Sequence, residues 1–332
     1  MKELDFVLAS GAEHLKRNLL EKGYRVFSSD TNYDGKRFFP NTDLYVRLSE
    51  VSDLSSRRVV VIQSCTGSSP REYERFTTAD RIQELLLILN VLKEPVHVRK
   101  VGHKKYECTD LKPPARVEVV LTMQPYALQD KAFETGETAA AYHAIKAIAK
   151  ACDKLWLVAP VVTRDTTWAA KMMKEGEYVE INITKSIVEF GAACFGFDDY
   201  ILVGPDEGAQ SRFGVPGLHK RREDSFTIEL SGEIDVRGKR VIVIDDLTKS
   251  GSTLLKSRDI LLKQGATDVG LVVLHVTPIS DNGEELLENL VKRSDGKIVT
   301  SNTVQTYTFD QKYPHLTYDI VPILLQHLTT LS

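Results

Sequence analysis

The chain has 332 residues, of which 42% are hydrophobic and 27% are charged, and its formal net charge is -3. This length favours two domains with ordinary hydrophobic cores, and the near-neutral charge excludes a nucleic-acid partner that depends on a basic excess. No apolar run approaches the ~20 residues of a membrane span, and the N-terminal residues lack a secretory signal pattern. We therefore expect a cytoplasmic protein with no membrane partner and no nucleic-acid partner.

Short β-branched runs alternate with longer segments of helical periodicity. This alternation predicts an α/β fold in which βαβ units build mostly parallel sheets. The predicted strands are residues 58–62, 117–121, 155–158, 200–203, 241–244 and 269–275. The predicted helices are residues 79–92, 138–151, 186–195, 252–264 and 284–292.

Two halves can be drawn in this pattern. We expect an N-terminal domain over residues 1–165, a C-terminal domain over 166–310, and a terminal segment, 311–332, that packs back on the fold. Residues 93–116 are polar and basic, so they are interpreted as an insertion or an extended hairpin with a solvated surface. The pattern assigns no role to that insertion.

One segment combines an acidic pair with a row of small and hydroxyl residues. The predicted strand 241–244 ends in Asp245 and Asp246, at the edge of the sheet where α/β proteins bind ligands. Carboxylates there can accept hydrogen bonds from ribose hydroxyls, and a helix start provides backbone N–H groups for a phosphate. The residues at that helix start are Lys249, Ser250, Gly251, Ser252 and Thr253. A capped helix after a strand that ends in two aspartates is the purely structural alternative, and the phosphate-sugar interpretation is favoured.

This segment resembles the ribose-5-phosphate loop that phosphoribosyl-pyrophosphate synthetases share with type I phosphoribosyltransferases. The resemblance implies two phosphoribosyltransferase-like domains, each a mostly parallel sheet flanked by helices. It implies that Asp245 and Asp246 hold the ribose hydroxyls and that residues 250–253 hold the 5-phosphate. Lys249 stands where an acidic or small residue is more usual, which would add a phosphate contact.

Two further stretches favour a synthetase over a transferase. Residues 204–212 resemble the synthetase Pro-Asp-x-Gly turn, which implies Mg²⁺ as cofactor and Asp206 as a metal ligand. Residues 220–222 resemble the mobile catalytic loop, which implies that Lys220 and Arg222 stabilise the phosphoryl groups during transfer. Cations suit that step because charge spreads over the transferring oxygens. Taken alone, a structural turn and a solvated basic surface would explain the two stretches.

Two stretches earlier in the chain imply which residues bind the nucleotide. Residues 124–137 are similar to a synthetase segment that lines the nucleotide pocket, which implies that Gln129 and Asp130 bind ATP. Residues 36–48 resemble the adenine-contacting loop that the family lends to a neighbouring subunit. The ATP-binding residues implied there are Phe39, Asn41 and Asp43. A loop shared in this way implies a homodimer or a higher homo-oligomer.

Three stretches depart from the family pattern, all of them among the residues that the resemblance assigns to binding of the nucleotide and the metal. Leu128 replaces an arginine before the Gln-Asp pair, and Asn-Thr-Asp at 41–43 replaces Asp-Gly-Glu. The strand that normally ends in a metal-binding histidine instead reads Leu-Val-Ala-Pro over residues 157–160. These departures raise the question of which donor and acceptor the site uses.

The activity that the resemblance implies is magnesium-dependent transfer of the pyrophosphoryl group of ATP to the anomeric hydroxyl of ribose 5-phosphate. The products would be phosphoribosyl pyrophosphate and AMP. Three alternatives remain: a divergent pyrophosphokinase acting on another 5-phosphorylated ribose, a weakly catalytic regulatory subunit of a synthetase, and a phosphoribosyltransferase.

Overall fold

The computed structural model describes residues 4–162, 167–222, 228–231 and 234–330. The chain divides into two compact units. Unit 1 contains the N-terminal residues up to Ser68 together with Tyr73–Pro160 and Trp168–Ile181, and unit 2 contains Ser69–Glu72 and the chain from Asn182 onward. The expected domain boundary at residue 165 lies before Trp168–Ile181, which belong to unit 1 because their strand pairs with the unit 1 sheet.

Unit 1 is built on a six-stranded sheet whose strands all run parallel. In spatial order the strands are β2 (Arg25–Ser28), β1 (Leu4–Leu8), β3 (Arg58–Ser64), β6 (Arg116–Met123), β7 (Lys154–Val158) and β8 (Val179–Ile181). The helices of this unit are α1 (Lys16–Glu21), α2 (Thr78–Lys93), α3 (Ala140–Ala151) and α4 (Thr167–Lys174), with short 3-10 turns at Glu13–Leu15 and Val51–Leu54.

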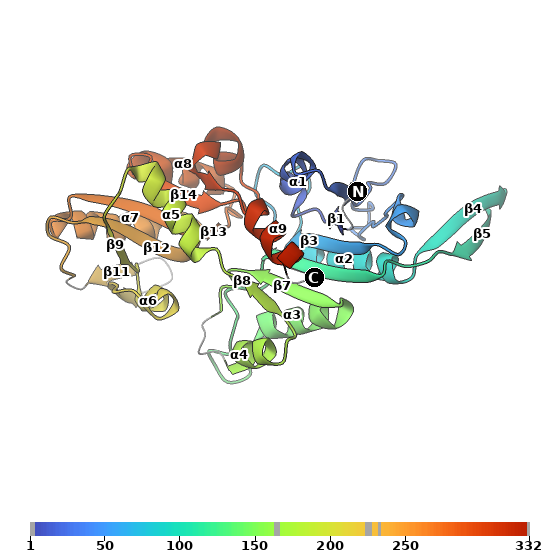
Figure 1. Ribbon diagram of the computed structural model, residues 1–332, viewed down its shortest axis with the longest axis horizontal. Coiled ribbons are helices and arrows are strands. Elements are labelled where there is room, and N and C mark those ends of the chain that lie inside the picture. Colours follow the sequence, from blue (N-terminus) through green and yellow to red (C-terminus); the bar gives the residue numbers. More distant parts are fainter. Residues whose placement is uncertain (1–3, 163–166, 223–227, 232–233, 331–332) are drawn as a thin grey trace. The chain divides into compact units, whose positions relative to one another are not determined.

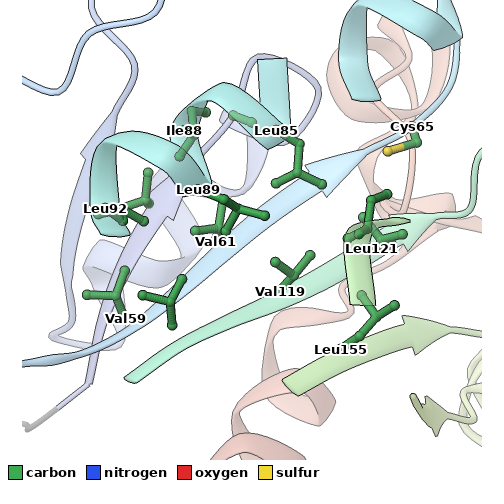
Figure 2. Close-up of a cluster of buried hydrophobic side chains, with 14 of the residues drawn as sticks. Val59, Val61, Cys65, Leu85, Ile88, Leu89, Leu92, Val119, Leu121 and Leu155 are labelled. Carbon is green, nitrogen blue, oxygen red and sulfur yellow. The ribbon is translucent and has the colours of Figure 1, made fainter. Parts of the chain in front are cut away.

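The core of unit 1 lies between the sheet and α2 (Figure 2). Alternate residues of β3, Val59 and Val61, face the helix, and the apolar positions of α2 recur at helical spacing. Those helix residues are Leu85, Ile88, Leu89 and Leu92, all of them buried. Thr77 and Asp80 form a capping box that fixes where α2 begins.

Residues 93–116 contain an antiparallel hairpin of β4 (Val96–Gly102) and β5 (Lys105–Asp110), as the sequence predicts. The hairpin projects from the rest of unit 1 (Figure 1), and almost all of its residues are exposed.

Unit 2 has a five-stranded parallel sheet, with a separate hairpin beside it. In spatial order the strands are β15 (Thr317–Tyr318), β14 (Ile298–Ser301), β13 (Asp268–Val276), β12 (Arg240–Thr248) and β9 (Ile201–Val203). The hairpin strands are β10 (His219–Arg222) and β11 (Ile228–Ser231), which pair antiparallel. The helices are α5 (Thr184–Phe195), α6 (Glu207–Phe213), α7 (Ser252–Lys263), α8 (Gly283–Arg293) and α9 (Val321–Thr330), with a π-helical turn at Thr308–Lys312 and a 3-10 turn at Pro314–Leu316.

The unit 2 sheet is covered on both faces, which explains its continuous apolar strands. Four consecutive residues of β12, Val241 to Ile244, are fully buried. On one face the strands pack against α7 and α8, and on the other Gly270 of β13 lies against Phe195 of α5. A Cβ atom at position 270 would lie 2.3 Å from the Phe195 ring, so only glycine permits this close packing.

All strands and helices predicted from periodicity are confirmed, with ends that differ by up to four residues. The α/β fold class is likewise confirmed, with two mostly parallel sheets flanked by helices. No helix among the described residues is long and apolar enough to span a membrane.

Candidate active site

The candidate site lies where β9 ends beside β12, which continues beyond it to Thr248. Ile201 pairs with Val241 and Val203 with Val243, so the residues that follow Val203 are near the C-terminal part of β12. The first element after β9 is the short helix α6, and Asp206 is its N-cap. Its Oδ1 accepts a hydrogen bond from the Ala209 N–H at 3.0 Å, which fixes the carboxylate at this edge of the sheet.

The two aspartates of β12 are held by their own backbone and by an arginine. Asp245 Oδ1 accepts a hydrogen bond from the Asp246 N–H at 2.9 Å. Arg212, in the last turn of α6, donates from a terminal guanidinium nitrogen to Asp246 Oδ2 at 3.0 Å. The side chains of Arg212 and Asp246 are only 12% and 25% exposed, so this is a partly buried ion pair.

The pKa of Asp246 lies above its usual value because burial disfavours the charged carboxylate. Arg212 opposes this shift, and the nearby carboxylate of Asp206 adds to it. The site thus gathers three carboxylates, Asp206, Asp245 and Asp246, and the balancing cation Arg212 at a single sheet edge. Such an arrangement suits hydroxyl groups and cations as ligands.

The loop from Thr248 to Ser252 turns the chain from β12 into α7. The Gly251 N–H donates to Thr248 Oγ1 at 2.9 Å, and Gly251 has a left-handed backbone with φ of 74°. A Cβ atom at this position would lie 2.4 Å from Leu290, so glycine is required for both space and conformation.

The start of α7 provides the features of an anion site. The N–H groups of its first turn have no acceptor within the helix, and the helix dipole favours a negative charge there. Ser250 and Ser252 place their hydroxyls 3.3 Å apart, while Lys249 and Ser252 are exposed to solvent. The sequence prediction for Ser250, Gly251, Ser252 and Thr253 therefore falls on a loop with the geometry of a phosphate cradle.

Lys220 and Arg222 lie on strand β10, where Lys220 pairs with Leu230 and Arg222 with Ile228 of β11. Strand β10 follows α6 closely in the chain, and Gly217 forms a bridge to Gly204 directly after β9. The backbone of this hairpin is thereby anchored beside the end of β9.

The five residues predicted to bind nucleotide all lie in unit 1, on two separate segments. The first segment is a tight turn in which the Phe39 N–H donates to the Asp43 carbonyl at 2.8 Å and the Asn41 amide donates to the Asp43 carboxylate at 2.6 Å. Asn41 and Asp43 are exposed there. In the second segment Gln129 is partly buried and Asp130 is buried, and the Asp130 carbonyl accepts a hydrogen bond from the Trp168 indole at 2.7 Å.

The end of β7 confirms that no histidine or carboxylate side chain stands at residues 159 and 160. Ala159 is buried in a left-handed conformation, with φ of 41°, and its N–H donates to the Ile181 carbonyl at 3.0 Å. Among the residues that the structure describes, no group of three or more His, Cys, Asp or Glu side chains is arranged to hold a metal ion.

Arg212 is the site residue that sequence reasoning did not assign. It lies six positions after Asp206, at the end of the stretch that resembles the Pro-Asp-x-Gly turn. Its charge was visible in the sequence, but its partner Asp246 is 34 positions away and becomes a neighbour only because β9 pairs with β12.

Comparison with known proteins first defines the class. Residues 201–311, which contain the whole candidate site, match the phosphoribosyl transferase domain family. The crystal structure of phosphoribosylpyrophosphate synthetase from Mycobacterium smegmatis has the same fold, with a TM-score of 0.68 over 99% of both chains at 21% identity. Unit 2 is thus an α/β domain of the phosphoribosyltransferase class.

Curated archaeal relatives extend the similarity over nearly the full chain. Ribose-phosphate pyrophosphokinase from Pyrococcus furiosus is 27% identical over 310 residues, covering 90% of this chain and 94% of the relative. The protein of the same name from Thermococcus kodakarensis is 24% identical over 333 residues, covering 97% and 99%. Over nearly its full length the chain is thus similar to ribose-phosphate pyrophosphokinases.

Proposed function

We propose that this enzyme transfers the pyrophosphoryl group of ATP to the anomeric hydroxyl of ribose 5-phosphate, giving phosphoribosyl pyrophosphate and AMP. The observation that carries this proposal is the continuous run from the Asp245–Asp246 pair through the Gly251 loop into α7. Carboxylates for a sugar and N–H groups for its 5-phosphate follow one another within a single strand–loop–helix connection. The similarity to ribose-phosphate pyrophosphokinases supports the same reaction.

In this proposal the acceptor binds through both of its ends. The 5-phosphate lies at the start of α7, where Ser250, Gly251, Ser252 and Thr253 offer N–H and hydroxyl donors and Lys249 adds a positive charge. Asp245 and Asp246 accept hydrogen bonds from the ribose hydroxyls and orient the sugar. Fixing both ends holds the anomeric oxygen in one place, which is the main way in which such an enzyme can accelerate a bimolecular step.

The donor set fits a magnesium ion held largely by water and substrate. Asp206 lies close enough to Asp246 to raise the pKa of that carboxyl, so two hard oxygen donors are near each other. Magnesium in phosphoryl-transfer sites commonly uses one or two carboxylates together with substrate phosphates. A bound magnesium ion would neutralise phosphate charge; within the protein, Asp206 would hold it, without the histidine that the family usually has after β7.

The chemical step needs no covalent enzyme intermediate. The anomeric oxygen forms a bond to the β-phosphorus of ATP, and the bond from that phosphorus to the oxygen bridging to the α-phosphorus breaks as AMP leaves. Lys220 and Arg222 on the β10 hairpin would stabilise the charge on the transferring oxygens. Phe39, Asn41, Asp43, Gln129 and Asp130 would bind the ATP, with the adenine loop shared between copies of the chain in a homo-oligomer.

The test is an AMP-release assay with ATP, magnesium and ribose 5-phosphate. The variant Asp245→Ala should lose turnover, and the matched control Asp198→Ala should keep it. Asp198 is an exposed aspartate of the same unit that lies before β9, at the opposite end of the strand from the site. Absence of turnover by folded protein with any magnesium concentration would refute the proposal.

A second candidate acceptor, in place of ribose 5-phosphate, is motivated by the end of β7, where the family histidine is replaced. Both changes, at Ala159 and Leu128, lie in unit 1, whereas the residues proposed to bind the ribose and its phosphate lie in unit 2. A larger 5-phosphorylated ribose that turns over when ribose 5-phosphate does not would identify this alternative. Co-purification with an active synthetase, together with inactivity of the chain alone, would instead indicate a regulatory subunit.

A further inference from the structure

We propose that Arg212 is a positioning residue that holds the Asp246 carboxylate in the orientation needed to bind the ribose hydroxyls. The inference rests on the proposed function, since it assigns Asp246 to the sugar. It adds a residue to that site, and it separates recognition of the sugar from recognition of the phosphate.

The geometry starts from α6. Asp206 caps the first turn of this helix, and Gly214 ends it in a left-handed conformation with φ of 65°. The helix is therefore fixed at both ends, and Arg212 falls in its last turn beside β12. From there the guanidinium reaches Asp246 Oδ2 at 3.0 Å. A charged hydrogen bond of this length orients the carboxylate as well as stabilising it.

The electrostatics make the arginine necessary at this place. Asp246 is largely buried, and Asp206 presents a second negative charge near it. Without the guanidinium, two carboxylates would face each other at a sheet edge with little water to screen them. The Asp246 side chain would then turn away, and a hydroxyl ligand would lose its acceptor.

The remaining acceptor capacity of Asp246 is what the sugar would use. A carboxylate can accept about four hydrogen bonds, so one guanidinium contact leaves capacity for ribose hydroxyls. The phosphate cradle does not depend on this contact. Its turn is closed by the Gly251–Thr248 hydrogen bond and continues into α7. Loss of Arg212 should therefore weaken binding of the sugar and leave binding of a free phosphate unchanged.

The chain offers a matched control in Arg258, on the middle of α7. Its side chain is also 12% exposed and also pairs with an aspartate, Asp295, at 2.5 Å. Asp295 precedes β14, so this pair lies at the amino end of the unit 2 sheet. An effect of arginine loss on folding alone should appear in both variants, and an effect on sugar binding should appear only at position 212.

The experiment compares Arg212→Met, Arg212→Lys and Arg258→Met with the full chain. Binding of ribose 5-phosphate and of inorganic phosphate is measured by titration calorimetry, and the melting temperature reports folding. For Arg212→Met we expect ribose 5-phosphate affinity to fall by about 10- to 100-fold, as for other residues that orient a ligand-binding group, with phosphate affinity within about two-fold. Arg212→Lys should recover part of the loss, and Arg258→Met should change neither affinity.

Three outcomes overturn the inference. The first is an Arg212→Met protein that binds ribose 5-phosphate as the unaltered chain does. The second is equal loss of both ligands, which would mean that Arg212 only supports the fold of the site. The third is full additivity, in which the binding free energy lost in the double variant Arg212→Met/Asp246→Asn equals the sum of the losses in the two single variants. Two residues that act as one unit would not be additive. If the unaltered chain itself fails to bind ribose 5-phosphate, the proposed function fails as well.

Discussion

The two units carry similar parallel sheets, but the carboxyl ends of their strands differ. In unit 1 the ends of β1 and β3 are filled by the protein's own polar side chains. In unit 2 the end of β12 presents two partly exposed aspartates and a hydroxyl-rich loop.

The unit 1 edge is closed by a fully buried network. Gln63 accepts a hydrogen bond from the Gly11 N–H at 2.9 Å and donates to Glu84 at 2.9 Å. Glu84 also accepts from Ser10, and Arg81 bonds the Ser10 hydroxyl. Gln63, Arg81 and Glu84 are each at most 1% exposed. Polar groups that are buried and bonded to one another in this way specify the local structure.

The unit 2 edge is closed at one end and open at the other. Beyond β14 the buried Glu284 accepts hydrogen bonds from the N–H groups of Tyr307 and Thr308 at 3.0 and 2.9 Å. At β12 Arg212 donates to Asp246, and both aspartates of the acidic pair remain partly exposed. The proposed site therefore coincides with the sheet edge whose acidic groups remain partly accessible, whereas the acidic group of the unit 1 edge is buried.

The largest effect on stability is expected from disrupting the buried polar network at the unit 1 sheet edge. Glu84→Ala removes the buried acceptor of Gln63 and Ser10 and leaves the Arg81 charge buried, so the free energy of unfolding should fall by about 3–5 kcal/mol. Chemical denaturation would measure it. Glu21→Ala, at an exposed carboxylate in unit 1, should change stability by less than about 0.5 kcal/mol. Similar small values for both variants would show that the network does not stabilise the unit.

At the unit 2 sheet edge, the variant Gly251→Ala should lose phosphate binding, and its free energy of unfolding should fall by about 2 kcal/mol. The reasons are the left-handed backbone and the clash with Leu290. Gly196→Ala is the control, because Gly196 has a φ of 69° with nothing within 4 Å of an added Cβ. The control should show only the backbone cost and keep phosphate affinity. Retained phosphate binding in Gly251→Ala would argue against the cradle.

A pH-dependent effect is expected beyond β14. Burial raises the pKa of Asp310 to about 7, although the Thr306 N–H opposes this and Glu284 adds to it. Because the folded pKa is raised above the unfolded value, this group stabilises the fold at low pH. That contribution is lost as the pH rises from about 4 through 7, by roughly 2 kcal/mol between pH 5 and 8.

The variant Asp310→Asn should therefore gain stability relative to the unaltered chain as the pH rises. Its amide oxygen can still accept the Thr306 N–H bond. Melting curves from pH 5 to 8 would measure the difference, which should grow across this range. A constant difference would mean that Asp310 does not change protonation in it.

The smallest effect is expected at Lys249, which is exposed in the loop. Lys249→Ala should weaken phosphate binding by about two- to five-fold, since an exposed charge contact contributes less than about 1 kcal/mol. The effect should diminish at high salt. An affinity loss as large as that of Gly251→Ala would mean that the lysine, rather than the backbone cradle, dominates.

Periodicity and motif spacing located about half of the described strands and helices. The apolar run at 241–244 and the acidic pair after it predicted the strand and its ligand-binding end, because burial on both faces of a parallel sheet selects such a run. The elements that were missed are short or carry polar residues inside. In β1, for example, the apolar pattern is broken by Asp5, which is fully buried and paired with Arg57 at 2.7 Å.

The sequence by itself determined the local chemistry of this protein: the strand that carries Asp245 and Asp246 toward its carboxyl end, and the glycine that allows the turn after it. Both depend on neighbouring residues in the chain. Only the tertiary structure decided which polar groups remain accessible, and it brought Arg212 to Asp246 through the pairing of β9 with β12. The physical reason is that burial and long-range ion pairs depend on strand order, which residue spacing does not encode.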